Sequence, residues 1–262
     1  MSLLQVRGKP ITAGRIVRSL KHRVLARLRP VNSYQGVYST FTEAAQKAPR
    51  GKPLGYDAAD SQNWYLNKHT EVQLEDYPVL FWLRGAFENS RSVFEIGGHV
   101  GVAYYGFSQV VDYPADLKWT ICDVPTVATA GATLAKERGR TNINFVTHPD
   151  QAEGADIVLA AGALQYVDSP SLADAIASFR IKPRHVLINT TPVYDGPAFV
   201  TLQYIGTAFC PYRIFNREEL AGSLKKIGYS LVASWRKERT FRIPGHPDKS
   251  FDHYSGFYFR AD

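Results

Sequence analysis

The chain has 262 residues, of which 45% are hydrophobic and 21% are charged. These proportions are ordinary for a globular protein and exclude a largely disordered chain. No apolar run approaches the roughly 20 residues of a membrane-spanning helix, and the N-terminus lacks the apolar core of a secretory signal. Two cysteines, Cys122 and Cys210, are too few for a disulfide framework, so we expect a cytoplasmic protein.

The net charge of +7 is concentrated in residues 1–30, which contain eight Lys or Arg and no acidic residue. The rest of the chain is nearly neutral, so no nucleic-acid partner is expected. Within this basic leader, Val17, Leu20, Val24 and Leu28 have helical spacing. The pattern fits an amphipathic helix on an acidic partner or at the inner face of the membrane. It fits equally a helix packed on the body or on a second copy in a homodimer.

Residues 31–90 are predicted to form a helical cover over the domain that follows. Thr40 and Glu43 have capping-box spacing, which predicts a short helix after Thr40. Residues 61–88 are rich in aromatic side chains and contain a single glycine, so they indicate a second helix, interrupted near Pro78.

From residue 91 to residue 262, short apolar runs alternate with helical segments, which predicts a mostly parallel sheet covered on both faces. Two final apolar runs have no helix between them and predict a terminal antiparallel hairpin. The expected strands are 92–97, 119–124, 143–147, 155–162, 185–191, 228–237 and 254–260, with helices at about 100–110, 125–138 and 170–180.

A glycine turn follows the first of these strands, in the sequence VFEIGGHVG. A nicotinamide dinucleotide site requires G-x-G-x-x-G, and no register of Gly97, Gly98 and Gly101 provides it. The strand instead carries an acid, Glu95, and a second acid, Asp123, ends the next strand. An acid at this second position can accept hydrogen bonds from ribose hydroxyls.

The acid on the first strand favours S-adenosylmethionine (SAM) over a dinucleotide. A dinucleotide places its pyrophosphate at a helix N-terminus, whereas SAM has no phosphate and carries an ammonium group that an acid can bind. Glycines let the backbone approach such a ligand closely. SAM is therefore the expected cofactor, with S-adenosylhomocysteine (SAH) as product, and no metal is expected. The predicted cofactor-binding residues are Glu95, Gly97, Gly98, His99, Gly101, Asp123, Val124 and Gln165.

From residue 91 to about 260 the chain resembles class I SAM-dependent methyltransferases, which implies an α/β, Rossmann-like fold. The pieces GVYSTFTEAAQKA, DIVLAAGALQYVDSP, LINTTP and CPYRIFNREEL also resemble a family of bacterial methyltransferases. Genes of that family are found among those for surface-polysaccharide (lipopolysaccharide, O-antigen) biosynthesis. This resemblance covers about residues 31–260. One departure is Asn189-Thr190-Thr191-Pro192, where an arginine-containing piece is expected, so the role of that arginine is not carried over.

Four side chains are candidates for catalysis or substrate binding. His99 could act as a general base, or it could hydrogen-bond a neighbouring loop. Tyr166 could position an acceptor hydroxyl or contact the sulfonium through its ring, or it could fill the core. Tyr212 and Arg213 lie where a substrate-specificity insertion would fall. Arg213 could pair with a phosphate or carboxylate of the acceptor, or with an acid of the body.

The expected reaction is methyl transfer from SAM to a small, glycan-like molecule, at a hydroxyl of a sugar or glycan precursor. Two alternatives stay open. One is a non-catalytic, SAM-binding partner protein with a degenerate methyltransferase fold, since no catalytic base is obvious. The other is an NAD(P)-dependent reductase, which the glycine spacing disfavours.

Overall fold

The computed structural model describes residues 30–57 and 71–262. The predicted basic leader therefore lies outside the described residues, apart from Pro30, as does part of the helix predicted over 61–88. Within the described ranges, no helix combines the length and the apolar character needed to cross a membrane.

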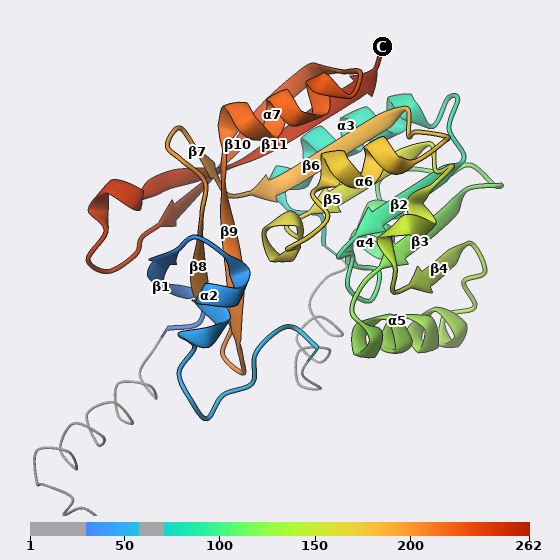
Figure 1. Ribbon diagram of the computed structural model, residues 1–262. Helices are drawn as coiled ribbons and strands as arrows, with labels where there is room; N and C mark the ends of the chain where they lie inside the picture. The colour runs from blue at the N-terminus through green and yellow to red at the C-terminus, as the bar shows by residue number, and fades with distance from the viewer. Residues whose placement is uncertain (1–29, 58–70) are drawn as a thin grey trace, which may run out of the picture.

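A seven-stranded sheet forms the centre of the molecule (Figure 1). The five strands from β2 to β6 pair in parallel, and β11 runs antiparallel to both of its neighbours, β6 and β10. The order across the sheet is β10-β11-β6-β5-β2-β3-β4. This confirms the predicted parallel sheet with a terminal antiparallel hairpin. Its strands are β2 (Ser92–Ile96), β3 (Lys118–Cys122), β4 (Ile143–Val146), β5 (Ile157–Ala161), β6 (His185–Thr191), β10 (Tyr229–Phe241) and β11 (Phe251–Ala261).

Helices cover both faces of this sheet, as its nearly continuous apolar strands require. The first face is covered by α3 (Tyr77–Ala86), α4 (Val102–Phe107) and α5 (Pro125–Glu137). The second face is covered by α6 (Leu172–Ser178) and α7 (Arg217–Lys226). Short 3-10 turns complete the connections: η2 (Leu74–Asp76), η3 (Pro149–Ala152), η4 (Leu164–Tyr166) and η5 (Pro247–Lys249).

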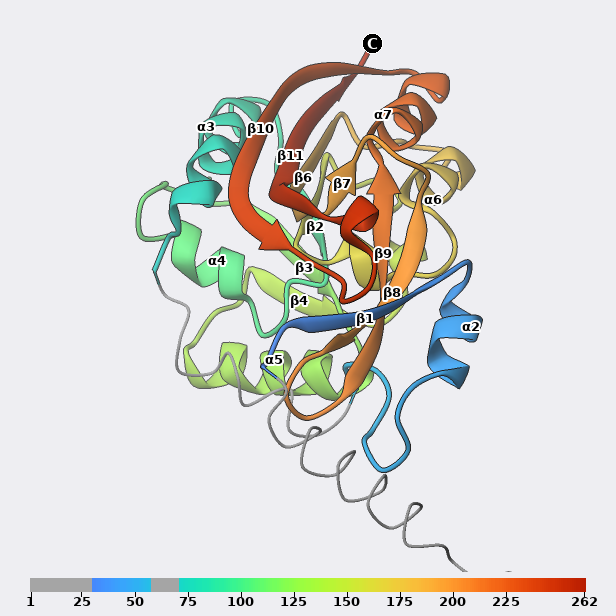
Figure 2. The same cartoon turned by 90° about the vertical axis from the view of Figure 1, so that its left-hand side faces the viewer.

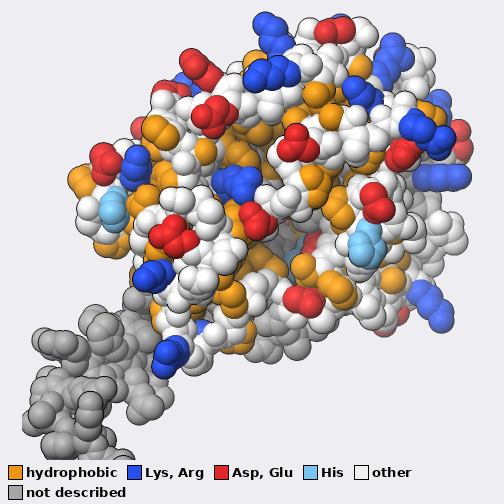
Figure 3. All heavy atoms as spheres, viewed as in Figure 1, with side chains coloured by type: hydrophobic (Ala, Val, Ile, Leu, Met, Phe, Trp, Pro, Cys, Tyr) orange, Lys and Arg blue, Asp and Glu red, His pale blue; other side chains and the backbone are white. Residues whose placement is uncertain are grey.

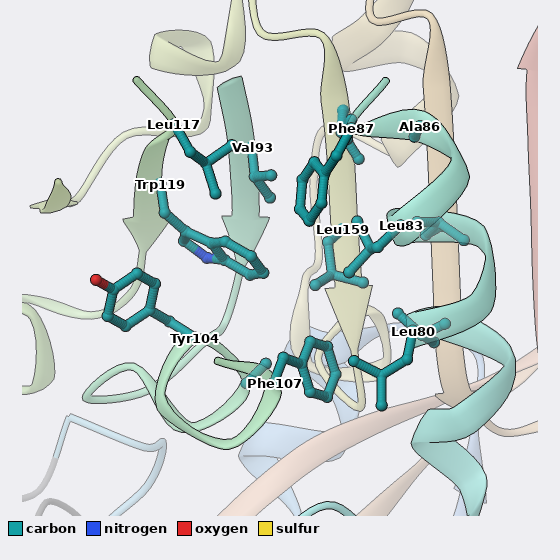
Figure 4. Close-up of a cluster of buried hydrophobic side chains, with 14 of the residues drawn as sticks. Leu80, Leu83, Ala86, Phe87, Val93, Tyr104, Phe107, Leu117, Trp119 and Leu159 are labelled. Carbon is teal, nitrogen blue, oxygen red and sulfur yellow. The ribbon is translucent and has the colours of Figure 1, made fainter. Parts of the chain in front are cut away.

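The core on the first face surrounds β2, the middle one of the five parallel strands. Val93 of β2 packs with Trp119 of β3, and Leu83 of α3 lies over Leu159 of β5 (Figure 4). Side chains alternate along a strand, so Glu95 points to this same apolar face, two residues after Val93. A carboxyl group in such a place needs a specific partner.

A second, smaller sheet lies beside the main one (Figures 1 and 2). Its order is β1-β8-β9-β7, with strands β1 (Ser33–Tyr38), β7 (Val193–Tyr194), β8 (Phe199–Tyr204) and β9 (Phe209–Asn216). Helix α2 (Phe41–Gln46) packs on β8 and β9 through Phe41 and Ala44. The hairpin of β10 and β11 curves away from the main sheet toward the small sheet. Its residues Phe241 and Phe251 pack in one cluster with Tyr34 of β1.

The N-terminal cover differs from the prediction in two places. Residues 33–38 form a strand, so the cover is not purely helical. Pro78 lies in the first turn of α3 and begins that helix, because a first-turn proline has no helical hydrogen bond to lose. The predicted helix after Thr40 is confirmed, and Thr40 Oγ1 accepts a hydrogen bond from the Glu43 N–H at 3.1 Å.

Candidate functional site

A cavity of about 920 Å³ lies between the carboxyl ends of the parallel strands and the small sheet. Figure 3 shows a hollow near the centre of this face, with charged side chains around it. The volume is within the range of small-molecule and cofactor sites. Its walls combine the turn after β2, the ends of β3 and β5, and residues of β8 and β9. They include Glu95, Gly97, Gly98, His99, Asp123, Val124, Gly162, Tyr166, Phe199, Val200 and Arg213.

Glu95 lies at the base of the cavity and is 2% exposed. Its Oε2 accepts a hydrogen bond from the Trp119 indole N–H at 2.9 Å. Burial raises the pKa of Glu95 to about 8, although the Trp119 hydrogen bond acts in the opposite direction. The group is therefore protonated at neutral pH in the ligand-free protein, and a cation beside it would favour its carboxylate form.

The glycine turn fits closely around this carboxyl group. A Cβ atom at Gly98 would lie 2.6 Å from Oε2 of Glu95, and one at Gly97 would lie 2.4 Å from Cβ of Ala163. Gly97 and Gly101 also have positive φ angles, of 67° and 100°. Side chains at these positions would meet the acid or strain the turn, so glycine is required here for steric reasons.

Asp123 joins the ends of β2 and β3. Its Oδ2 accepts the His99 N–H at 2.9 Å, and its Oδ1 accepts the Val124 N–H at 2.8 Å. Burial raises the pKa of Asp123, and these two hydrogen bonds act against the shift. Each carboxylate oxygen can accept a further hydrogen bond, so the group can still bind ligand hydroxyls. Gly101, by contrast, caps α4 in the left-handed conformation behind the turn and is not among the residues that line the cavity.

His99 adopts a left-handed backbone conformation, with φ of 53°. This conformation is uncommon for a residue other than glycine, and the hydrogen bond from its N–H to Asp123 helps to hold it. The residue is 9% exposed and lines the cavity. The turn thus brings a histidine to the same cavity as both acids.

Tyr166 ends η4 and lines the cavity, and its hydroxyl has two polar neighbours. Tyr56 donates to Tyr166 Oη at 3.2 Å, and Tyr166 donates to Gln203 Oε1 at 2.6 Å. The Gln203 amide is held in turn by donating to Oδ1 of Asn32 at 3.0 Å. Burial raises the pKa of Tyr166 well above its ordinary value, so the phenol stays protonated.

Gln165 and Tyr212 lie behind the cavity wall. Gln165 is 3% exposed, and its amide donates to the carbonyl of Gly162 at 2.7 Å. Tyr212 is 1% exposed, with its hydroxyl 2.9 Å from that of Tyr254. Neither is among the described residues that line the cavity. Their contacts are those of packing residues that support Gly162 and the small sheet.

The wall formed by η2 carries two further acids. Glu75 forms an ion pair with Lys237 of β10, and Asp76 Oδ1 accepts a hydrogen bond from the Asn189 side chain at 3.2 Å. Asn189 Oδ1 accepts the Trp235 indole N–H at 3.0 Å. The asparagine that departs from the expected family pattern therefore holds η2 against the sheet.

Sequence reasoning missed Trp119, Tyr56 and Gln203. Trp119 had a usable signal, because β2 and β3 pair with Val93 opposite Trp119. Alternation along both strands then places the indole on the same face as Glu95. Tyr56 and Gln203 had none, because they meet Tyr166 from distant parts of the chain. Within the described residues, no cluster of His, Cys, Asp or Glu could hold a metal ion.

Comparison with protein-family models and with curated proteins finds no match. Solved structures are similar in fold. A Galdieria sulphuraria protein described as a sarcosine dimethylglycine methyltransferase has a TM-score of 0.51 at 12% identity, over 77% of this chain and 98% of that chain. A Listeria monocytogenes protein described as a SAM-dependent methyltransferase has a TM-score of 0.50 at 11% identity. The match covers 72% of this chain and 97% of that chain. The chain thus has the Rossmann-like fold of class I methyltransferases.

Proposed function

We propose that this protein is a SAM-dependent methyltransferase that acts on a small-molecule acceptor. One observation carries the proposal: a buried acid, Glu95, and a half-buried acid, Asp123, flank a glycine turn at the carboxyl edge of a class I methyltransferase sheet. In open α/β sheets, ligands bind at this edge.

The residues present fit SAM. Glu95 provides an acceptor for the ammonium group, and Asp123 provides acceptors for the ribose hydroxyls. Gly97 and Gly98 carry no side chain that would meet Ala163 or Glu95, so the turn can keep its close fit and present its backbone to the cofactor. A dinucleotide fits less well, because Glu95 lies directly against the turn that would have to receive a pyrophosphate.

When bound, SAM supplies a methyl group on a positively charged sulfur. The chain contributes by holding the acceptor close and aligned with that group. The proton of the Tyr166 hydroxyl is committed to Gln203, and its oxygen already accepts the Tyr56 hydroxyl, so one acceptor site of that oxygen remains for a ligand. Tyr166 can therefore orient an incoming hydroxyl but does not remove its proton. His99 is the group in the cavity suited to act as the base.

The acceptor that we propose is a hydroxyl of a sugar or glycan precursor, methylated at oxygen. The support is the sequence resemblance to methyltransferases of surface-polysaccharide gene clusters, together with a cavity wide enough for a second molecule beside the cofactor.

Calorimetric titration of the full chain with SAH and with NAD(P) tests the cofactor. We expect SAH to bind and NAD(P) not to bind; the absence of SAH binding by folded protein would overturn the proposal. Transfer of a labelled methyl group from SAM to a panel of sugars and sugar nucleotides tests the reaction. SAH binding without transfer to any acceptor, including cell extract, would favour the non-catalytic alternative.

His99→Ala separates the two roles open to that residue. If His99 is the base, the variant binds SAH as tightly as the wild type and transfers methyl groups slowly. If it supports the loop, SAH binding weakens as well.

A further inference from the structure

Acidic residues outnumber basic residues among the described residues that line the cavity. Arg213 of β9 is the one Lys or Arg among the described residues that line it. Four of these acids belong to β2, the end of β3 and η2, on the side of the main sheet, whereas Arg213 belongs to the small sheet. The acids that line the cavity are Glu71, Glu75, Asp76, Glu95, Asp123 and Glu219.

Two aromatic rings and one polar residue hold the Arg213 guanidinium in place. It lies 5.0 Å from the ring centre of Phe41 and 6.0 Å from that of Phe215. Its Nη2 donates to the carbonyl of Asp168 at 3.1 Å and to Oδ1 of the same residue at 3.3 Å. A guanidinium stacked in this way is oriented before any ligand arrives, so less side-chain freedom is lost on binding.

This arrangement leaves donors available. A guanidinium has five N–H groups, and only Nη2 of Arg213 hydrogen-bonds within the described residues. The Arg213 side chain is 26% exposed, and the paired Asp168 side chain is 60% exposed. An ion pair this open to water is weak, so an anion from solution can compete with Asp168 or bind the remaining donors.

We infer that Arg213 binds an anionic group, a phosphate or a carboxylate, carried by the acceptor. This inference rests on the proposed methyltransferase function and specifies the class of acceptor: an acidic sugar derivative, not a neutral one. The planar fork of arginine matches both anions. The Asp123 carboxylate on the side of the main sheet repels an anion, so the acceptor enters with its charge toward Arg213 and its hydroxyl toward the cofactor.

A purely structural role makes a different prediction. If Arg213 only fastens the turn at Asp168 to β9, weakening the pair from either side should change anion binding in the same direction, although Asp168→Asn keeps the hydrogen bond to the Asp168 carbonyl. If Arg213 binds a ligand anion, removing Asp168 removes a competitor. Arg213→Gln and Asp168→Asn should then change anion binding in opposite directions.

The test titrates SAH-loaded full chain with three probes at constant ionic strength: glucose 1-phosphate, glucuronate and methyl glucoside. We expect one or both anionic sugars to bind, and the neutral glucoside to bind much more weakly. The two anionic probes distinguish phosphate from carboxylate. Arg213→Gln should weaken binding of the anionic sugar about tenfold to a hundredfold, since hydrogen bonds to charged groups contribute about 1.5–3 kcal/mol.

Matched variants complete the test. Arg213→Lys keeps the charge without the planar fork and should give intermediate affinity, and Asp168→Asn should equal or exceed the wild type. The inference is wrong if anionic and neutral sugars bind alike or not at all, or if Asp168→Asn weakens binding as much as Arg213→Gln. SAH affinity should be unchanged in all three variants. A wild-type protein that is folded but does not bind SAH would contradict the proposed function, which is a different outcome from failure of this inference.

Discussion

Glu95 couples the stability of the protein to pH. Its pKa is 4.5 without the protein environment and about 8 in the folded chain, because burial disfavours the charged form. Between pH 4.5 and about pH 8, Glu95 has lost its proton in the unfolded chain but keeps it in the folded chain. The contribution of this group to stability is therefore fully present below about pH 4.5 and is lost as the pH rises to 8.

The first prediction follows from this titration. The free energy of unfolding of the wild type should fall, relative to that of Glu95→Gln, as the pH rises from 5 to 8. Urea unfolding of both proteins at several pH values in that window measures it. Parallel profiles would show that burial does not hold the proton on Glu95.

The same proton should be released when the cofactor binds. The ammonium group of SAH favours the Glu95 carboxylate, so binding near pH 7 should release protons and tighten as the pH rises toward 8. Calorimetry in buffers with different ionisation enthalpies counts the protons. Glu95→Gln should lose most of this release and bind SAH about tenfold more weakly or worse, because one side of a buried charged contact is gone. An unchanged proton count in the variant would assign the release to another group.

Gly98 gives a steric test of the same site. Gly98→Ala would place a methyl group 2.6 Å from a Glu95 oxygen, so it should abolish measurable SAH binding or lower the affinity strongly. Gly222→Ala is the matched control. Gly222 lies in α7 with no atom within 4 Å of an added Cβ, and its substitution should leave binding unchanged and stabilise the helix by up to about 1 kcal/mol. Normal SAH binding by Gly98→Ala would place the ligand elsewhere.

At the scale of the elements, the main sheet could be predicted and the small sheet could not. Strands β2 to β6 are nearly continuous apolar runs separated by helix signals, so their positions in the chain and their parallel pairing could be predicted. Strand β1 lacks such a signal, because Tyr34 is its only buried residue. Its conformation depends on pairing with β8, where Ser33 lies opposite Tyr204. Local pattern carries no information about a partner so distant in the chain.

The candidate site also has a part that could be predicted from the sequence and a part that could not. Glu95, the glycines and Asp123 lie at or just beyond the carboxyl ends of predicted strands, so their convergence could be inferred from parallel topology. The surroundings of Tyr166 required the tertiary structure, since Gln203 and Tyr56 come from other elements. Without these contacts, a buried tyrosine that orients a hydroxyl could not be distinguished from one that fills the core.

Thr201 tests how the small sheet is held together. This fully buried threonine of β8 donates to the carbonyls of Gln35 at 3.1 Å and Gly36 at 2.7 Å, where the register of β1 shifts. Thr201→Val keeps the shape but leaves these half-buried carbonyls without that donor, so it should cost about 1–3 kcal/mol of unfolding free energy.

The control for this substitution is Thr129→Val. Thr129 is exposed on α5, where its hydroxyl donates to the Pro125 carbonyl at 2.8 Å. The control should change stability by less than about 0.5 kcal/mol in urea unfolding. Equal effects at the two sites would show that the hydroxyl of Thr201 contributes little to the attachment of β1.

At the scale of the whole molecule, residues of both the main sheet and the small sheet line the cavity. Binding of SAH there should therefore stabilise the complete fold against unfolding. At an SAH concentration one hundred times the dissociation constant, the stabilisation is about 2.7 kcal/mol. For a chain of this size that corresponds to a rise in melting temperature of about 5–10 °C. Thermal unfolding with SAH, and with NAD(P) as the comparison, measures the effect. An equal rise with NAD(P) would contradict the assignment of the turn to SAM.

The pairing of β1 with β8 has a consequence for the newborn chain. Strand β1 leaves the ribosome early, but its partner is made only after most of the main sheet, and Phe241 and Phe251 follow later still. Contacts between such distant segments form slowly. The pocket for the cofactor can therefore be assembled before the wall that faces it exists. A chain stalled after β6 would contain the turn proposed to bind the methyl donor, but it would lack Arg213 of β9, which is proposed to bind the methyl acceptor.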